Sequence, residues 1–579
     1  MLSREAARER LTLMFWRPKG HVDIKDGTPE SLSAFPEKAV EQQANADAMD
    51  TSPDEQSEGQ QHFRPSFRFA CVMLVLWLLT LLVAIDSTAI STALLSIASH
   101  LDATTVQTEW IANAYMVTAG AFQFLFSSLS DIYGRKPLII AAFMFLLVGT
   151  IMCGVSQNIE TLLAGRTIQG IGAAGTLVIP EVLVADLIPL RLRGVYYAIL
   201  AGSWAVGGGV GPIIGGAFAE TVTWRWIFYL NLPICGVSLA ITPFALKLKK
   251  VHADRSFMEK FKMIDIGGNI LFLGSSTSLM LGLSLGGISY PWGDARSIVP
   301  IVVGGAGLVS TVLYEIHVAS QPMINMKVFS TWGAIAAQVQ NVLQGIVVMA
   351  WLYFLPMYFQ GIKLYNPLIT GLAQIPVAVV LSIAALLAGV VIRWSGHYLF
   401  VQWISLVLAS VGMGLYILLN LDTTVAEWIF LAVAPGIGLG MLYSSSAQSA
   451  MAPINPSLWT DAAAVMSFAR SLGEAFGVAV GGAIFASQMK HHLSKIDNVQ
   501  VDPTKVIQVV EYIQQLPEGD IRHQLQNALL KTIRTLMLVM MIFCIVGLSL
   551  CVFMKEYSID IAHEVQQGID EDRTDESED

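Results

Sequence analysis

The chain has 579 residues, of which 54% are hydrophobic and only 13% are charged, and its mean hydropathy is +0.59. Soluble domains carry about 25% charged residues, so this composition excludes an ordinary soluble protein. The net charge of −10 says little about partners because much of the acid lies in the tails, and no nucleic-acid partner is expected. Runs such as 73–85 and 138–159 lack charged residues. About 20 apolar residues span a bilayer, so the sequence predicts an all-α polytopic membrane protein.

Two polar tails flank the apolar part of the chain. Residues 1–66 and 555–579 contain acidic, low-hydrophobicity stretches that are typical of segments without a core of their own. The first tail has no apolar signal-peptide core. We expect both tails to be disordered, with a short amphipathic surface helix in residues 1–18 as an alternative.

Apolar stretches predict fourteen transmembrane helices, separated by charged or Gly/Pro-rich breaks. The Gly-rich stretch LSLGGISYPWGDARS divides the seventh helix from the eighth. The helices are expected near 69–97, 107–130, 137–157, 161–186, 195–219, 224–246, 264–288, 298–317, 332–360, 366–393, 398–419, 427–452, 460–488 and 528–554.

Basic residues follow alternate predicted helices. Arg191 and Arg193 follow the fourth helix and a run of lysines follows the sixth, whereas the loops after the first, third and eleventh have neither Lys nor Arg. Because basic loops stay in the cytoplasm and the helix count is even, both termini are expected there. The long loop 489–527 then lies outside, and its stretch TKVIQVVEYIQQL predicts a short helix.

Cofactor and metal motifs are not indicated. The five cysteines fall in predicted spans without a CxxC pair, and the ten histidines lie in loops, tails or at helix ends, which disfavours haem ligation. GIGAAG at 170–175 matches GxGxxG by letter, but it lies inside an apolar helix instead of after a strand. We interpret its small residues as a helix-packing face. No cofactor, no metal and no enzymatic activity are expected.

A charged segment, SSLSDIYGRKPLII at 127–140, interrupts two apolar runs. Gly134 permits a tight turn, and Arg135 and Lys136 are suited to the cytoplasmic side. GVVIRWSGHYLF at 389–400 aligns with this segment. The alignment places Gly396 on Gly134 and Arg393 on Asp131. Related turns in two halves are typical of secondary transporters.

SSLSDIYGRKPL resembles the signature loop of the major facilitator superfamily, with Ser127 in place of the usual glycine. LLAGRTIQGIGAAG resembles the helix-4 motif of the family, and GGGVGPIIGG the helix-5 antiporter motif. AIDSTAISTAL and FARSLGEAFGVAVGGAIF are similar to the fourteen-span drug:proton antiporter branch. The matches cover residues 84 to 485.

The resemblance implies the major facilitator fold, in which two six-helix lobes flank two additional helices. The implied domains are a lobe over 67–246, a basic loop over 247–263, the additional helices over 264–317, and a lobe over 318–554. It also implies that Asp131, with Arg135 and Lys136, stabilises one conformer at the cytoplasmic gate, and that helix 5 bends against the opposite half. The helix-5 motif residues are Gly207, Gly211, Pro212, Gly215 and Gly216.

Charges inside predicted spans are candidate transport residues, because a charge at a helix centre costs about 2.5–3.5 kcal/mol. We expect Asp86 and Arg166 to pair, either as a proton-switched pair or as a static link between two helices. Glu474 lies one turn after Arg470, so these two residues can neutralise each other or can meet a cation or proton. Glu181 is a third candidate acid. Trp204, Tyr353, Tyr358 and Phe359 either line the cavity or pack in the core.

The favoured function is proton-coupled export of a hydrophobic or amphipathic small molecule by a monomer. The alternatives are a carrier that imports or sequesters a siderophore, amino acid or polyamine, and a membrane sensor that does not transport. A membrane oxidoreductase is disfavoured by the lack of intramembrane histidines. The sequence looks most like fungal members, for which the plasma membrane is expected first and the vacuolar membrane second.

Overall fold

The computed structural model describes residues 67–103, 105–246, 256–286, 290–319, 322–496 and 506–560. The chain divides into the units Met1–His62 and Phe63–Asp579. The predicted tail 1–66, residues 561–579 of the predicted tail 555–579, and residues 247–255 of the predicted basic loop lie outside the described residues.

The described residues fold into helices alone, apart from turns and an isolated bridge between Gly286 and Tyr290. Four single-turn 3₁₀ helices, η1 to η4, accompany them. The α-helices are α4 (Phe67–His100), α5 (Thr105–Ala121), α6 (Gln123–Tyr133), α7 (Arg135–Val155), α8 (Ile159–Leu187), α9 (Leu190–Thr221), α10 (Trp226–Ala245), α11 (Phe257–Lys262), α12 (Ile266–Leu285), α13 (Ala295–His317), α14 (Trp332–Gly361), α15 (Pro367–Ser395), α16 (Tyr398–Leu415), α17 (Val425–Met451), α18 (Trp459–Leu493), α19 (Val506–Gln515) and α20 (Asp520–Leu550).

Thirteen helices of the described chain are long and apolar enough to cross a membrane, whereas the sequence predicted fourteen. The difference is the predicted span 107–130, which is divided at Phe122 into α5 and α6. The backbone N–H of Phe122 still bonds to the carbonyl of Thr118 at 3.2 Å, so the interruption is local. Its two parts follow each other along one passage of the chain.

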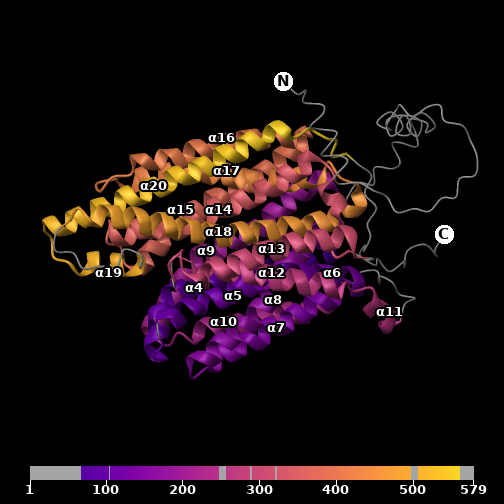
Figure 1. The fold of residues 1–579 in the computed structure, drawn as a ribbon, viewed down its shortest axis with the longest axis horizontal. Helices are drawn as coiled ribbons and strands as arrows, with labels where there is room; N and C mark the ends of the chain where they lie inside the picture. Colours follow the sequence, from indigo (N-terminus) through magenta and orange to yellow (C-terminus); the bar gives the residue numbers. More distant parts are fainter. Residues whose placement is uncertain are drawn as a thin grey trace, which may run out of the picture. The chain divides into compact units, whose positions relative to one another are not determined.

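The helices form two groups that meet along a shared interface (Figure 1). In the N-terminal group, α4 packs on α9 and α10, and α8 packs on α5 and α7. In the C-terminal group, α14 packs on α18 and α20, and α17 packs on α15 and α16. Across the interface, α9 packs on α15 and α17, and α8 packs on α18. The lobe boundaries expected from the sequence, 67–246 and 318–554, remain predictions.

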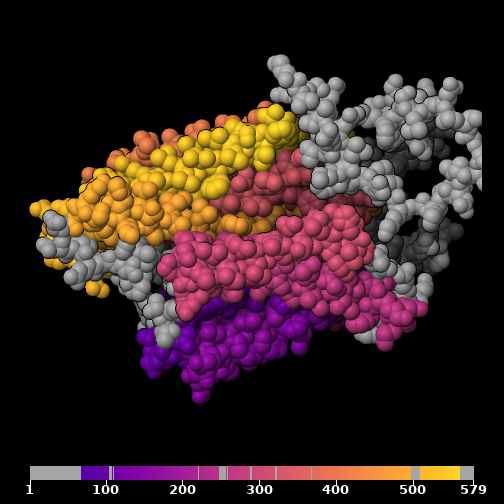
Figure 2. Space-filling model, in the orientation of Figure 1, coloured from indigo at the N-terminus to yellow at the C-terminus, as the bar shows by residue number. Residues whose placement is uncertain are grey.

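Helices α12 and α13 pack against each other, and α12 contacts α5 and α18, one from each group. Figure 2 shows this pair lying over the boundary between the two groups. Ile298, Val302 and Val309 of α13 are exposed although they are strongly apolar. Such a surface is unfavourable in water and suits the hydrocarbon of a bilayer.

The connection between α18 and α20 is shorter than the predicted loop 489–527, because α18 continues to Leu493 and α20 begins at Asp520. The predicted short helix in this loop is confirmed as α19. The end of the bundle that carries α19 is called the α19 end. The opposite end, which carries α11 and the junction of α6 and α7, is called the Gly134 end after the glycine at that junction (Figure 1).

Candidate functional site

Asp86 of α4 lies at the centre of a buried polar network in the N-terminal group. Its side chain is 0% exposed. Oδ2 accepts a hydrogen bond from Nη1 of Arg166 at 2.5 Å, and Oδ1 accepts from the amides of Gln169 and Asn231, each at 3.0 Å. Arg166 and Gln169 belong to α8 and Asn231 to α10. The predicted pairing of Asp86 with Arg166 is confirmed, and two amides complete it.

Arg166 has further partners around its planar guanidinium. Nε donates to the carbonyl of Ile111 at 2.9 Å, and Nη1 also donates to Oε1 of Gln169 at 2.8 Å. The ring of Tyr115 lies 4.2 Å below the guanidinium carbon, which is a cation–π contact. Gln169 in turn donates to Oγ1 of Thr150 on α7 at 3.0 Å. One charge pair therefore connects α4, α5, α7, α8 and α10.

A second ion pair joins the two helix groups. Oε1 of Glu181, on α8, lies 2.7 Å from Nη1 of Arg470 on α18, and the two side chains are 9% and 13% exposed. Tyr443 of α17 donates its hydroxyl to the same carboxylate at 3.4 Å, and its ring lies 4.1 Å from the guanidinium carbon of Arg470. Oε2 of Glu181 and Nε and Nη2 of Arg470 have no hydrogen-bond partner among the described residues.

The interpretation of Arg470 and Glu474 as a self-contained pair is wrong. The ion pair of Arg470 within the described chain is with Glu181, because the interface brings α8 against α18. Glu474 is half-buried one turn further along α18. Arg166 and Glu181 lie about four turns apart on α8, roughly 22 Å. The five candidate residues thus form two separate sites, one inside the N-terminal group and one between the groups.

The predicted gate segment lies at the junction of α6 and α7. The backbone of Gly134 has φ 95°, which favours glycine. Arg135 is buried, forms an ion pair with Asp131, and donates to the hydroxyl of Ser130 at 2.9 Å. The Lys136 ammonium donates to the carbonyl of Pro243 at 2.8 Å. The segment therefore fastens the ends of α6, α7 and α10 together.

The related turn in the C-terminal group also has a glycine with positive φ. Gly396 has φ 75° and ends α15. In the described chain, the glycines with left-handed φ are Gly134 and Gly396, the two that the sequence alignment superposed. Arg393 differs from its aligned residue Asp131, since its side chain is exposed and its carbonyl accepts a hydrogen bond from Nε of Arg191 at 2.7 Å.

The two groups touch closely at the Gly134 end. Arg193 of α9 is buried, and its guanidinium carbon lies 4.0 Å from the ring of Trp459 on α18. A Cβ atom on Gly389 of α15 would lie 2.6 Å from the backbone of Gly194 on α9. Ser444 of α17 donates to the carbonyl of Gly194 at 3.1 Å. Arg193, which the sequence analysis assigned to the basic loop after the fourth predicted helix, thus helps to hold the two groups together.

The helix-5 motif divides its contacts between α4 of its own group and α15 of the opposite group. A Cβ on Gly211 would lie 3.2 Å from the backbone nitrogen of Ala89 on α4, and one on Gly207 would lie 2.9 Å from the nitrogen of Ile85. Gly215 also faces α4, whereas Gly216 meets open space. Pro212 is the motif residue that faces the other group, at Gly371 of α15.

The glycines of GIGAAG are confirmed as a packing face inside α8, because Cβ atoms there would meet α5 and α7.

Sequence reasoning missed a row of amides on α14. Asn341 and Gln344 are buried, and Gln344 donates to the carbonyl of Leu439 at 3.1 Å. Four amides within seven residues of an apolar span were the available signal.

Of the aromatic candidates, Tyr358 and Phe359 are fully buried in the core of the C-terminal group.

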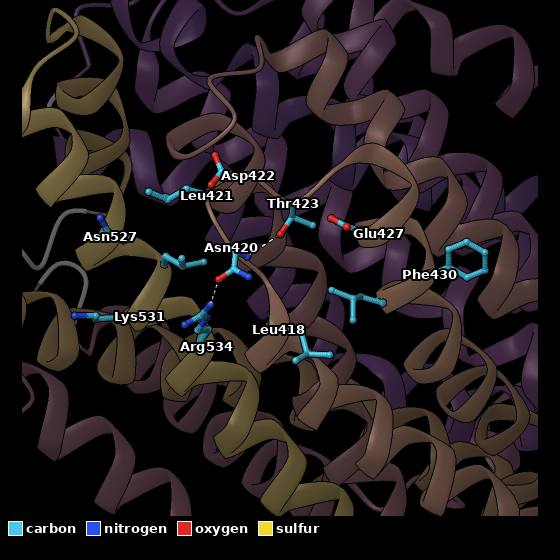
Figure 3. Close-up of a pocket in the computed structure, with 12 residues that line it drawn as sticks. Leu418, Asn420, Leu421, Asp422, Thr423, Glu427, Phe430, Asn527, Lys531 and Arg534 are labelled. Carbon is cyan, nitrogen blue, oxygen red and sulfur yellow. Dashed lines mark hydrogen bonds between the residues drawn. The ribbon is translucent and has the colours of Figure 1, made fainter.

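A cavity of about 790 Å³ lies at the α19 end of the C-terminal group, away from every predicted site residue. Figure 3 shows Lys531 and Arg534 of α20 on one side of it and Asp422 and Glu427 on the other. Lys363, in the connection between α14 and α15, donates to the carbonyl of Leu421 at 2.5 Å. Burial lowers the pKa of Lys363 below its usual value, and Asp422 and Glu427 oppose that shift.

Two groups of apolar helices, with paired charges buried inside and across them, define a multi-pass membrane transporter. The comparisons with known proteins identify the family. The family model described as Major Facilitator Superfamily matches residues 76–478, so the chain belongs to this superfamily. It is therefore a transporter and not an enzyme, and the resemblance seen in its motifs is confirmed.

The similar proteins of known description include fungal transporters. The chain is 34% identical over 524 residues to the MFS transporter L2 of a Phoma species, covering 90% of this chain and 87% of that protein. It is 32% identical over 514 residues to the efflux pump FUS6 of Gibberella fujikuroi, covering 87% and 92%. The crystal structure of the human organic anion transporter MFSD10 covers 83% of this chain and 99% of its own, with TM-score 0.53 and 13% identity, a likeness of fold alone.

Proposed function

We propose that this transporter exports hydrophobic or amphipathic small molecules in exchange for protons, and that Asp86 carries the proton. The observation that supports this most is the network around Asp86, a fully buried carboxylate with donors from α8 and α10. A buried acid within a membrane span is costly and is typically functional. The efflux pumps among its relatives favour export.

Protonation of Asp86 would loosen the N-terminal group and leave the Arg166 cation with neutral partners alone. A neutral carboxyl attracts Arg166 much less than a carboxylate does. Arg166 keeps the carbonyl of Ile111, Oε1 of Gln169 and the ring of Tyr115 as partners. The hydrogen bonds that Asp86 accepts from Gln169 and Asn231 weaken at the same time. Proton uptake at one residue thereby changes how α4 is held against α8 and α10.

The Glu181–Arg470 ion pair, which joins the two groups, is the proposed point at which substrate binding is coupled to the change of conformation. Glu181 and Arg470 have three buried polar atoms without partners, and unmet buried polar groups are costly. A polar group on an amphipathic substrate would satisfy one of them. Glu474, half-buried one turn away, supplies a further acid for a cation or a second proton.

The ion gradient is the proposed energy source, since no ATP-binding motif occurs in the sequence. One proton moving through 100 mV releases about 2.3 kcal/mol, and about 1.4 kcal/mol corresponds to a tenfold gradient. One proton thus sustains a substrate gradient of roughly fifty-fold from the voltage alone. In this proposal both termini are cytoplasmic, the Gly134 end faces the cytoplasm, and the plasma membrane is the location.

The test is transport in liposomes with an imposed pH gradient of either sign. Lipophilic cations and neutral toxins serve as probes. Accumulation inside an acidic lumen supports proton antiport, and accumulation inside an alkaline lumen supports the import alternative. A folded protein that moves no probe under either gradient, or under counterflow, supports the sensor alternative and overturns the proposal. Glu474→Gln is expected to alter which cationic probes are moved.

A further inference from the structure

The segment after the last helix crosses from one helix group to the other at the Gly134 end. Residues 555–560, called the C-terminal strap, follow η4 (Cys551–Phe553) and Met554. The strap has no helical structure, so side chains and a few hydrogen bonds must hold it. We propose that the strap is a latch that stabilises the conformer closed at the Gly134 end. This rests on the proposed export, in which the two helix groups would open to one side of the membrane at a time.

The first half of the strap is held by the C-terminal group. The hydroxyl of Tyr398, at the start of α16, donates to the carbonyl of Lys555 at 3.2 Å and accepts from the N–H of Tyr557 at 3.1 Å. Nδ1 of His397 lies 3.2 Å from a carboxylate oxygen of Glu556. Tyr398 is 1% exposed, so it offers a fixed anchor.

The second half of the strap is held by the N-terminal group. Both carboxylate oxygens of Asp560 accept hydrogen bonds from Nη1 of Arg191, at 2.9 and 3.1 Å. Arg191 lies in the first turn of α9 and also donates to the carbonyl of Arg393 on α15. One guanidinium thus holds the strap and the neighbouring helix of the other group together.

Ile559 gives the strap an apolar anchor between these two polar ends. It is 3% exposed and belongs to the buried cluster that includes Leu190 of α9 and Ala388 and Ile392 of α15. Arg191 and Asp560 are about half exposed, and exposed ion pairs contribute little individually. The buried isoleucine is therefore the larger contribution.

The contacts of the strap depend on the distance between the groups. Asp560 follows closely after Tyr557, which is held by Tyr398, so the strap can reach Arg191 only while the ends of α9 and α15 are adjacent. Opening the Gly134 end must break the Arg191–Asp560 pair and must disturb the buried cluster, shared by both groups, to which Ile559 belongs. The strap therefore favours the closed conformer by the free energy of these contacts and slows loading from that side.

The experiment compares two truncations of the full-length transporter. One ends at Met554 and removes the strap; the other ends at Asp560 and keeps it. Spin labels on cysteines at Phe244, in the last turn of α10, and Trp394 of α15 report the distance between the groups, in a background without the native cysteines. Both sites are exposed at the Gly134 end.

Truncation at Met554 is expected to increase the ratio of open to closed conformers about tenfold, which corresponds to 1.4 kcal/mol, whereas truncation at Asp560 leaves the distances unchanged. Equal distance distributions in the two truncations would overturn the latch. If the shorter chain does not fold, Ile559→Ser and Asp560→Arg replace it, and Arg191→Asp should partly restore the closed state of Asp560→Arg. No opening in Ile559→Ser and Asp560→Arg would equally overturn it.

This distance readout needs neither substrate nor proton gradient. If liposomes show no transport while the Met554 truncation opens the Gly134 end, the proposed function fails and the latch stands. If transport is driven by protons while the truncations behave alike, the latch fails and the proposed function stands.

Discussion

The two buried ion pairs on α8 differ in what they join. Asp86 and Arg166 both belong to the N-terminal group, so their contact can persist while the groups move relative to each other. Glu181 and Arg470 belong to different groups, so their contact must break if the groups separate there. The first pair therefore suits a proton switch. The second pair suits a contact that responds to the separation of the groups and to bound substrate.

The Glu181–Arg470 pair gives a prediction about stability. Arg470→Met leaves the carboxylate of Glu181 buried without its cation, a loss of about 3–5 kcal/mol. The double variant Glu181→Gln with Arg470→Met leaves no uncompensated charge and is expected to recover most of that loss. Apparent unfolding temperatures in detergent measure both. A double variant no more stable than Arg470→Met would show that the pair is not electrostatically coupled.

Sequence reasoning reached the charged residues of the site but not all their partners. Asp86 and Arg166 were paired correctly, because both charges lie at similar depths on antiparallel helices. The partner of Arg470 was missed, because the i,i+4 spacing on α18 pointed to Glu474, whereas Glu181 is almost 300 positions away in the chain. Spacing along one helix reports local neighbours, and only packing of α8 on α18 brings Glu181 near.

At the scale of the elements, close helix packing depends on glycines that have no room for a side chain. Helix α9 approaches α4 at Gly207, Gly211 and Gly215. Without a hydrophobic driving force between spans, such close backbone contact stabilises helix pairs in a membrane. The spacing of four residues places these glycines on one face of α9.

Two glycines of this motif provide a matched pair of variants. Gly211→Ala places a Cβ 3.1 Å from Cβ of Thr88, and overpacking of this kind costs about 1–3 kcal/mol. Gly216→Ala meets open space and is expected to be neutral or slightly stabilising, because alanine favours helix by about 1 kcal/mol. Thermal stability in detergent tests the difference; similar losses in both would contradict the packing described.

The helical elements were largely predictable because long apolar runs and charged breaks are strong local signals. The interruption of α5 and α6 at Phe122 was not, since the sequence FQFLF reads as one apolar run and backbone geometry decided the break. Which neighbour each glycine of the helix-5 motif contacts was also not predictable. Small residues indicate a packing face, but they do not say which neighbour fills it.

At the scale of the whole molecule, the described structure is closed at the Gly134 end. Gly194 and Gly389 bring the backbones of α9 and α15 into contact, and Arg193 reaches Trp459. If the Gly134 end faces the cytoplasm, this conformer cannot load substrate from that side. Opening would separate α9 from α15, and the contacts there set the balance between the two states.

Gly389 gives a prediction about that balance. Gly389→Val places side-chain atoms against the backbone of Gly194, so the closed conformer is strained and the open one is favoured. Spin labels at Phe244 and Trp394 should then report longer distances. Gly305→Val on α13, where a side chain meets nothing within 4 Å, is the control. Unchanged distances in Gly389→Val would show that this contact does not govern closure.

The central claim is that Asp86 couples proton movement to transport, and liposome transport by Asp86→Asn tests it most directly. Asp102→Asn, a change of an exposed acid in the turn after α4, is the matched control. We predict that Asp86→Asn loses accumulation driven by a pH gradient but keeps exchange of labelled for unlabelled substrate, while Asp102→Asn retains both. Gradient-driven accumulation by Asp86→Asn at the rate of the unaltered protein would contradict the account.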